Sequence, residues 1–328
     1  MKYNYIKLCI AAMATIVVMM LTGCKNTYKD QTDKINIVCT TFAQYDWVRE
    51  IAGDNMSGIN LVLLGNGADM HSYQPTTGDI LTISDADMFI YVGGISEEWV
   101  KNVQKQSENP NMIVINMMDV LGNQLYEEEH IEGMEEEHEH DHSQVIEYDE
   151  HVWLSLRNAI KICESIKDGL VTLDNANEEE YNTNYNNYVK KLEEVDKEYE
   201  MAVDNASCKT LLFGDRFPFI YMIKDYGLKY YAAFVGCSAE TEASFETVTF
   251  LANKLDELNL PAILIVEGSK VNLAKTINES TKNGNYPIYT LDSMQNVTID
   301  NIENGKTYID TMKSNLEILK KALGYVES

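Results

Sequence analysis

Basic residues are scarce in this chain: 26 lysines and arginines stand against 52 aspartates and glutamates, for a formal net charge of -26 at pH 7. Because such a surface repels phosphate backbones, the composition argues against nucleic acid as a partner. The sequence also lacks a nucleophile elbow, a P-loop and a Rossmann glycine fingerprint, and its one H-E-x-x-H match, His138 to His142, lies in an acidic segment without the apolar period of a helix. Since these usual signals of catalysis are missing, we expect a protein that is not an enzyme.

Long apolar runs are also missing, apart from one near the N-terminus between Leu8 and Leu21. This run is shorter than the about 20 residues that a membrane-spanning helix needs. Lys2 and Lys7 precede it. A short apolar run behind basic residues is typical of a signal peptide, which we predict for residues 1–23.

The apolar run ends in Leu21-Thr22-Gly23-Cys24, which resembles the lipobox of bacterial lipoproteins. In that motif cleavage leaves the cysteine as the first residue, and its sulfur carries a diacylglycerol. The resemblance implies that Cys24 anchors the protein to the lipid bilayer at the extracytoplasmic face of the bacterial cell membrane. The polar residues 24–34 would then be a lipidated, flexible tether. A plain signal peptide with an incidental cysteine is the alternative.

Cysteines are few, six in all, and no two of them form a CxxC pair. Cys39 and Cys163 lie among apolar neighbours, so we interpret them as small buried side chains. A disulfide between Cys208 and Cys237 would suit an oxidising compartment, but their spacing does not decide it.

Strands and helices alternate along most of the chain, which predicts an α/β fold with mainly parallel sheets. The predicted strands are 35–41, 59–64, 88–92 and 112–116, then 211–213, 229–234, 262–266 and 288–291. The predicted helices are 44–52, 77–84, 219–226, 245–258 and 271–281. We interpret these two runs as an N-terminal lobe at residues 35–177 and a C-terminal lobe at residues 207–328, each with a sheet flanked by helices.

Residues 178–206 separate the lobes and contain neither glycine nor proline. Apolar side chains recur there in alternating steps of four and three, at Tyr181, Tyr185, Tyr188, Leu192, Val195, Tyr199 and Ala202. This period predicts one long, rigid amphipathic helix that joins the lobes. A coiled-coil partner is the alternative, but so short and aromatic a repeat suits packing on both lobes better.

Residues 127–142 are almost entirely acidic or histidine, and they contain His130, His138, His140 and His142. Such a segment has too few apolar side chains to build a core. Because imidazoles bind zinc and carboxylates concentrate cations, we interpret it as a loop that collects metal at low affinity. A solvated acidic loop without this role is the alternative.

The other two histidines lie in two polar motifs that each follow a strand. His71 lies in Gly67-Ala68-Asp69-Met70-His71-Ser72-Tyr73-Gln74-Pro75-Thr76, and His151 in Asp149-Glu150-His151-Val152-Trp153-Leu154. Over nearly all of the mature chain, the sequence resembles the metal-specific solute-binding proteins of ABC transporters, a group with zinc and manganese receptors. That family has Pro-Gly-x-Asp-x-His-x-Tyr-Glu-Pro-Thr and Asp-Pro-His-Val-Trp-Leu at these two places.

The resemblance implies a function and two ligands. His71 and His151 take the positions of the first two metal ligands, and residues 127–142 lie where zinc-specific members often carry a histidine-rich loop. By this resemblance the chain is a monomeric extracytoplasmic receptor that binds Zn²⁺, with Mn²⁺ as the alternative, and delivers it to a membrane ABC permease. The family also has two lobes and a long helix, in agreement with the periodicity.

The sequence departs from the family at the third ligand, where Arg216 stands and a guanidinium cannot bind a cation. We predict its neighbour Asp215 as the substitute, with Arg216 orienting a carboxylate, and keep Cys237 and Glu240 as further candidates. The segment Tyr289-Thr290-Leu291-Asp292-Ser293 resembles the family's strand end, which implies Asp292 as the fourth ligand. A turn-forming aspartate is the alternative there.

Two imidazoles and two carboxylates do not decide between the metals. Zinc is satisfied by four such ligands, whereas manganese prefers more oxygen, which bidentate carboxylates could supply. The histidine-rich loop favours zinc. Two other classes of protein are the alternatives: a metalloenzyme with Glu150 or Glu267 as its general base, and a surface adhesin without a tight metal site.

Overall fold

The computed structural model describes residues 34–105, 109–135, 147–238 and 242–325 of the chain. Residues 35–328 form one compact unit, which holds both sheets and the hydrophobic clusters. The predicted signal peptide and the lipidated Cys24 lie outside the described residues. Among the helices that are described, none has the length and apolar character needed to cross a membrane.

The N-terminal sheet has four parallel strands in the order β2-β1-β3-β4. Its strands are β1 (Ile35–Cys39), β2 (Ile59–Leu63), β3 (Met88–Tyr91) and β4 (Ile113–Asn116). The helices of this part are α2 (Phe42–Ala52), α3 (Thr77–Ser84), α4 (Val100–Gln104), α5 (Met117–Leu121) and α6 (Leu156–Leu173). The apolar, partly β-branched strands suit a sheet that helices cover.

The C-terminal sheet also has four parallel strands, in the order β6-β5-β7-β8. Its strands are β5 (Thr210–Phe217), β6 (Lys229–Val235), β7 (Ile263–Val266) and β8 (Ile288–Leu291). The helices are α8 (Ile220–Tyr226), α9 (Phe245–Leu258), α10 (Asn272–Glu279), α11 (Ile299–Glu303) and α12 (Tyr308–Ala322). The predicted α/β fold with two mainly parallel sheets is confirmed.

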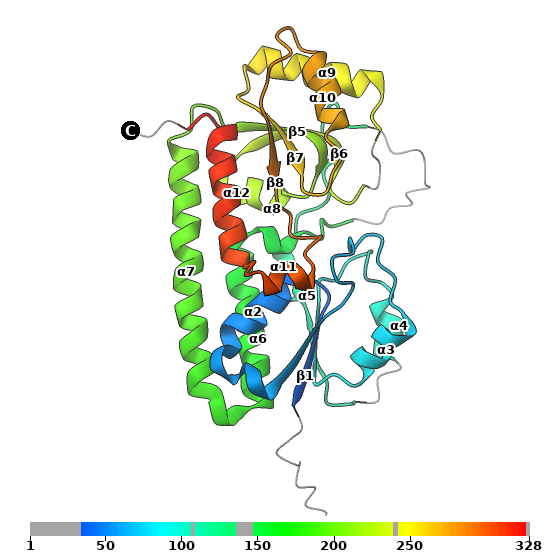
Figure 1. The fold of residues 1–328 in the computed structure, drawn as a ribbon, viewed down its shortest axis with the longest axis vertical. Helices are drawn as coiled ribbons and strands as arrows, with labels where there is room; N and C mark the ends of the chain where they lie inside the picture. Colours follow the sequence, from blue (N-terminus) through cyan, green and yellow to red (C-terminus); the bar gives the residue numbers. More distant parts are fainter. Residues whose placement is uncertain (1–33, 106–108, 136–146, 239–241, 326–328) are drawn as a thin grey trace, which may run out of the picture. The chain divides into compact units, whose positions relative to one another are not determined.

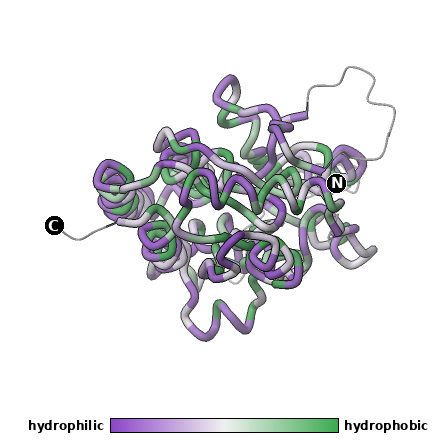
Figure 2. The backbone as a smooth tube through the Cα atoms, turned by 90° about the horizontal axis from the view of Figure 1, so that it is seen from above, coloured by the Kyte–Doolittle hydropathy of each residue, from purple (hydrophilic) through white to green (hydrophobic). Residues whose placement is uncertain are grey.

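The long helix α7 (Glu178–Asp204) lies between the two sheets in sequence, as its apolar period predicts. Its buried residues are Tyr181, Tyr188, Leu192, Val195, Tyr199, Ala202 and Val203. This face contacts α2 and α6 of the N-terminal part and also α12, which runs beside α7 in Figure 1. Along the helices in Figure 2 hydrophobic and hydrophilic stretches alternate, as amphipathic helices require.

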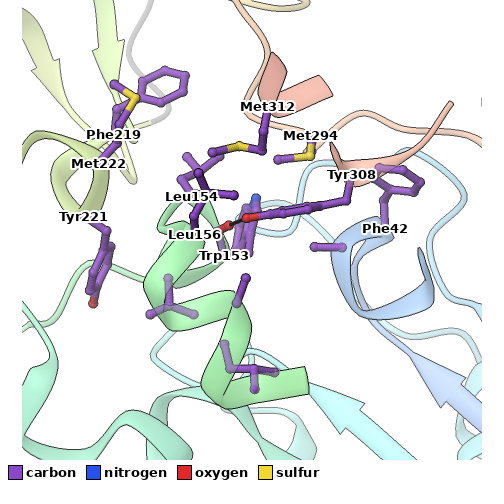
Figure 3. Close-up of a cluster of buried hydrophobic side chains, with 14 of the residues drawn as sticks. Phe42, Trp153, Leu154, Leu156, Phe219, Tyr221, Met222, Met294, Tyr308 and Met312 are labelled. Carbon is purple, nitrogen blue, oxygen red and sulfur yellow. Dashed lines mark hydrogen bonds between the residues drawn. The ribbon is translucent and has the colours of Figure 1, made fainter. Parts of the chain in front are cut away.

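A cluster of large buried side chains supports the backbone around Asp149 and Trp153 (Figure 3). The indole N–H of Trp153 donates to the carbonyl of Ser293 at 2.8 Å, and the Tyr308 hydroxyl donates to the carbonyl of Trp153 at 2.6 Å. The Tyr221 hydroxyl donates to the carbonyl of Asp149 at 2.8 Å. Since these donors and acceptors are buried, this segment is held firmly from several sides.

The first part of the predicted acidic loop packs against the C-terminal sheet. The backbone N–H of Glu135 donates to the carbonyl of Ala233 at 2.9 Å, and Met134 is buried in the main hydrophobic cluster. Residues 127–135 therefore build no core of their own, but Met134 adds to the main one. His130 is exposed, whereas His138, His140 and His142 lie outside the described residues.

Candidate metal site

His71 lies in the turn between β2 and α3. Its backbone N–H donates to the carboxylate of Asp69 at 3.1 Å. Gly67 in the same turn has a φ of +86°, and a Cβ there would lie 2.7 Å from the Thr298 side chain. Because only glycine fits there, the turn can approach the segment before α11 closely.

His151 is fully buried and precedes a short 3₁₀ helix, Val152–Leu154. The carboxylate of Asp149 accepts hydrogen bonds from its backbone N–H at 2.8 Å and from its ring Nδ1 at 3.0 Å. An acceptor on Nδ1 fixes the tautomer in which that nitrogen carries the proton. The lone pair of His151 is therefore on Nε2.

His71 is held in the same tautomer. Its Nδ1 lies 2.9 Å from the Ser96 hydroxyl and 3.6 Å from the Glu150 carboxylate, and a carboxylate on this side favours the proton on Nδ1. Burial and the neighbouring His151 lower the pKa of His71 to about 3. The ring is thus neutral over the physiological range, as an imidazole must be to bind a metal.

The two predicted histidines, 80 positions apart in the chain, meet in the fold: His71 Nε2 and His151 Nε2 lie 3.1 Å apart. With both protons on Nδ1, the two lone pairs face one another, and this repulsion is relieved only by a shared donor or cation. Zinc bonds to histidine nitrogen at about 2.0–2.1 Å, so one ion suits two nitrogens at this separation.

Cys237 lies beside the pair, in the turn after β6. Three side chains, those of His71, His151 and Cys237, each offer one ligand atom, and these atoms lie within 4.8 Å of one another. Among the described residues, this is the group of three side chains that could hold a metal ion. The backbone N–H of Cys237 donates to the Glu128 carboxylate at 2.9 Å. Burial and the carboxylates of Asp149 and Glu128 raise the pKa of the thiol.

Gln295 and Arg216 complete the surroundings of the imidazoles. The Gln295 amide nitrogen lies 3.3 Å from His71 Nε2 and is also hydrogen-bonded to His151 Nε2. Arg216 donates to the Gln295 amide oxygen at 3.0 Å, which turns the amide nitrogen towards the two rings. Nothing in the sequence signals this role of Gln295, because glutamine after a strand is unremarkable in itself.

Arg216 orients a carboxylate, that of Asp69. It forms an ion pair of 2.8 Å with Asp69, whose other oxygen accepts from the backbone of His71. Burial of Asp69 acts to raise its pKa, yet the guanidinium holds the pKa below its usual range. Arg216 therefore supports the His71 turn.

Asp215 is engaged by the backbone of its own sheet. One carboxylate oxygen accepts from the N–H of Arg216 at 2.8 Å and the other from the N–H of Val266 at 2.9 Å. The register of β5 shifts between Phe213 and Arg216, and the Asp215 side chain bonds the neighbouring strand β7 at this irregularity. Its position does not support our prediction that it is the third ligand.

Asp292 also lies outside the group at the imidazoles. Its carboxylate accepts from the backbone N–H of Met294 at 2.8 Å and forms an ion pair with Lys306. Met294 has a φ of +63°, so the aspartate stabilises a tight turn. The turn-forming alternative describes Asp292 better than the predicted role as fourth ligand.

Two other candidates have different outcomes. Glu240 lies outside the described residues. The possible disulfide between Cys208 and Cys237 is not formed, because both are free thiols in the structure.

A cavity of about 430 Å³ opens beside His71. Asp69, Asp215 and Glu267 are among the side chains that line it, together with Arg216. Burial and the charge of Asp292 raise the pKa of Glu267 to about 7. Lys270 also lines the cavity, so Arg216 and Lys270 balance part of the negative charge of these carboxylates.

The sequence model of the ZnuA family, described as zinc-uptake complex component A, periplasmic, matches residues 37–322. The chain belongs to the ZnuA family. The high-affinity zinc uptake system protein ZnuA of Bacillus subtilis is 30% identical over 307 residues, which cover 91% of this chain and 91% of that protein. The family resemblance that the two histidine motifs suggested is thus confirmed.

Longer ZnuA-family relatives exist. The zinc-binding lipoprotein AdcA of Streptococcus pneumoniae is 30% identical over 313 residues, which cover 94% of this chain and 60% of that protein. This chain therefore spans about 60% of the length of that relative. The crystal structure of the Zn(II)-bound ZnuA-like domain of the same AdcA is 26% identical, covers 88% of this chain and 99% of that domain, and superposes with a TM-score of 0.68.

Proposed function

We propose that this protein is an extracytoplasmic zinc receptor that binds Zn²⁺ with high affinity and delivers it to an ABC permease. The observation that carries the proposal is the pair of buried imidazoles, His71 and His151, whose unprotonated nitrogens face each other at 3.1 Å. Each ring is oriented through its other nitrogen, by Ser96 and by Asp149. Such partners are typical of histidines that bind metal.

Zinc is favoured over manganese by the donor atoms and by the relatives. The pair of imidazoles is a borderline donor set that suits zinc, and Asp215 and Asp292 are both engaged elsewhere, so the oxygen ligands that manganese prefers are few. The relatives of similar sequence are named a zinc-binding lipoprotein and a high-affinity zinc uptake protein.

The partners follow from the same family. Lipid attachment through Cys24 would keep the receptor at the membrane, near the permease, and a monomer suffices because both imidazoles belong to one chain.

We infer that the protein is not an enzyme. The relatives of similar sequence are named for zinc binding and zinc uptake, which supports this inference. The candidate general bases Glu150 and Glu267 accept hydrogen bonds from the backbone of Ser96 and of Ser293.

Titration calorimetry of residues 25–328, which include the whole compact unit, tests the proposal. We expect tight zinc binding with one ion per chain. Replacing a residue that orients a metal ligand typically lowers the affinity by roughly 10–100-fold, and replacing the ligand itself should lower it more. His71→Ala and His151→Ala should therefore each lower the zinc affinity by more than about 100-fold. His130→Ala, which changes an exposed histidine of the acidic loop, is the matched control and should bind as the wild type does.

Two results would contradict the proposal. One is the absence of tight zinc binding to the wild-type protein, which would favour the adhesin. The other is retention of affinity in both His71→Ala and His151→Ala, which would place the metal elsewhere, for example on His138, His140 and His142. Metal collection by these three histidines remains a prediction from the sequence.

A further inference from the structure

We propose that Cys237 supplies a thiolate as the third zinc ligand, so that His71, His151 and Cys237 form a donor set of two nitrogens and one sulfur. The inference rests on the proposed function and deepens it, because a sulfur ligand makes the site selective for zinc against manganese. It also replaces the two carboxylates that the sequence pattern favoured.

The first argument is distance. In a tetrahedral zinc site two histidine nitrogens lie about 3.3 Å apart, and a nitrogen and a cysteine sulfur lie about 3.6 Å apart. The two imidazole nitrogens are 3.1 Å apart, and the ligand atoms of all three residues lie within 4.8 Å of one another. A movement of the sulfur by little more than about 1 Å therefore completes the geometry.

The second argument is that the turn with Cys237 packs against Asp149, the carboxylate that orients His151. A Cβ on Gly236 would lie 2.8 Å from the Asp149 carboxylate and 2.9 Å from the carbonyl of Phe217, so the turn is in close contact with both. Asp149 is also the acceptor for the ring of His151. One carboxylate thus touches both the imidazole and the turn that presents the sulfur.

The third argument is a second anchor from the other side of the site. Glu128, on the segment that precedes the histidine-rich residues, accepts from the backbone N–H of Cys237. That segment is itself held to the C-terminal sheet by Glu135 and Ala233. Glu128 is a positioning residue, because it holds the backbone of the turn that presents the sulfur.

The fourth argument is the lack of another donor. Arg216 carries a positive charge where the family places its third ligand, and it is paired with Asp69. Asp215 and Asp292 are bound to backbone N–H groups and to Lys306. Among the described residues, Cys237 is the side chain of ligand type that reaches the two imidazoles.

Sulfur changes which metal is preferred. When zinc binds, the thiol proton leaves to solvent and a zinc–sulfur bond replaces the sulfur–hydrogen bond. Thiolates are soft donors that favour zinc, whereas manganese prefers carboxylate, carbonyl and water oxygens. The site should therefore discriminate between these two ions through Cys237, more than through the imidazoles.

Cobalt is the probe for the sulfur ligand, because Co²⁺ occupies zinc sites and a cobalt–thiolate bond absorbs strongly in the near ultraviolet. We expect this charge-transfer band in cobalt-loaded residues 25–328. Cys237→Ser should lose the band, and its zinc affinity should fall by more than about 100-fold while its manganese affinity changes much less. Cys208→Ser, which alters the other partly buried free thiol, should keep the band and the affinity.

The possible results separate this inference from the proposed function. If the wild-type protein binds zinc tightly but shows no charge-transfer band, or if Cys237→Ser keeps the band, the sulfur ligand is refuted and the receptor function stands. If Cys237→Ser lowers zinc and manganese affinity equally, the selectivity is refuted. If zinc does not bind tightly to the wild type, the proposed function fails with it.

Discussion

Single buried carboxylates hold distant segments of this chain together. Asp46 on α2 is almost fully buried, with 1% of its surface exposed, and accepts a hydrogen bond of 2.8 Å from the backbone N–H of Tyr308 at the start of α12. The Tyr308 ring packs edge-on against Trp47, the neighbour of Asp46. These contacts join residues 262 positions apart in the chain, so Asp46 has a structural role. Because its carboxylate is buried, its negative charge lowers the stability of the folded protein.

The buried charge of Asp46 predicts how stability depends on pH. Burial raises the pKa of Asp46 to about 6 in the folded protein, above the ordinary value near 3.9 of an unfolded chain. Between these values the folded protein binds more protons, so its free energy of unfolding falls as pH rises through about 4 to 6. Relative to Asp46→Asn, the wild type should lose about 2 kcal/mol between pH 4 and pH 7.

Urea denaturation of the metal-free protein and of the Asp46→Asn variant at each pH measures this difference. The comparison with the variant removes the contributions of other groups, which titrate equally in both proteins. A difference that stays constant, or that moves in favour of the wild type as pH rises, would contradict the raised pKa.

The sequence predicted some residues of the site and not others. His71 and His151 were identified because each stands in a motif with fixed neighbours, and the fold brings their rings together. Asp215 was preferred as the neighbour of Arg216 at the family's third-ligand position, and Asp292 because its segment resembles the family's strand end. An aspartate at such places is equally a common backbone acceptor. Only the local backbone decides between these roles.

Among the elements, α7 owes its place to one apolar face. Tyr181, Leu192 and Tyr199 on that face are fully buried, and the Tyr199 hydroxyl donates to the carbonyl of Met312 on α12 at 2.7 Å. Three glutamates lie in the first turn of the helix, where their negative charges interact favourably with the helix dipole and stabilise its N-terminal end. Its tertiary contacts, more than its intrinsic propensity, should therefore determine its stability.

Truncation of a buried α7 side chain tests this. Leu192→Ala removes a fully buried side chain and should lower the free energy of unfolding by about 2–5 kcal/mol, through lost burial and the cavity left behind. Lys190→Ala, on the exposed face of the same helix, should stay within about 0.5 kcal/mol of the wild type. Equal effects of the two substitutions in urea denaturation would refute the assignment of the buried face.

The strands and most of the longer helices could be predicted because the spacing of their apolar residues is a property of the local sequence. Among the exceptions, we predicted no element at the amphipathic helix α12, and for α6 only that Cys163 lies in a helix, without its bounds. The apolar spacing of α6 is present in the sequence, so that helix was predictable. The position of α12 beside α7 was not, because it depends on matching two apolar faces that lie far apart in the chain.

For residues 35–328 as a whole, the site joins the two lobes. The imidazoles come from the N-terminal part, whereas Cys237, Gln295 and Arg216 come from the C-terminal part. The close approach of Gly67 to Thr298 and the contacts of α12 add further connections. Any ion that binds these donors together must stabilise both lobes at once.

Calorimetric unfolding of residues 25–328 with and without zinc tests this coupling. Zinc at 100 times its dissociation constant should add about 2.7 kcal/mol and raise Tm by several degrees, with both lobes unfolding in one shifted transition. His71→Ala should show little shift under the same zinc concentration. Two transitions, of which only one moves with zinc, would mean that the ion binds to a single lobe.

The sequence alone determined the α/β class, the two sheets, the long helix and the pair of histidines, because period and motif are local properties of the chain. Tertiary structure alone decided which other side chains reach the imidazoles. Asp215 and Asp292 satisfy nearby backbone groups, and Arg216 neutralises Asp69, whereas the turn after β6 brings Cys237 to the site. The physical reason is that a buried polar group must form a hydrogen bond or an ion pair with a group beside it. Which groups lie beside it is decided only when the chain folds.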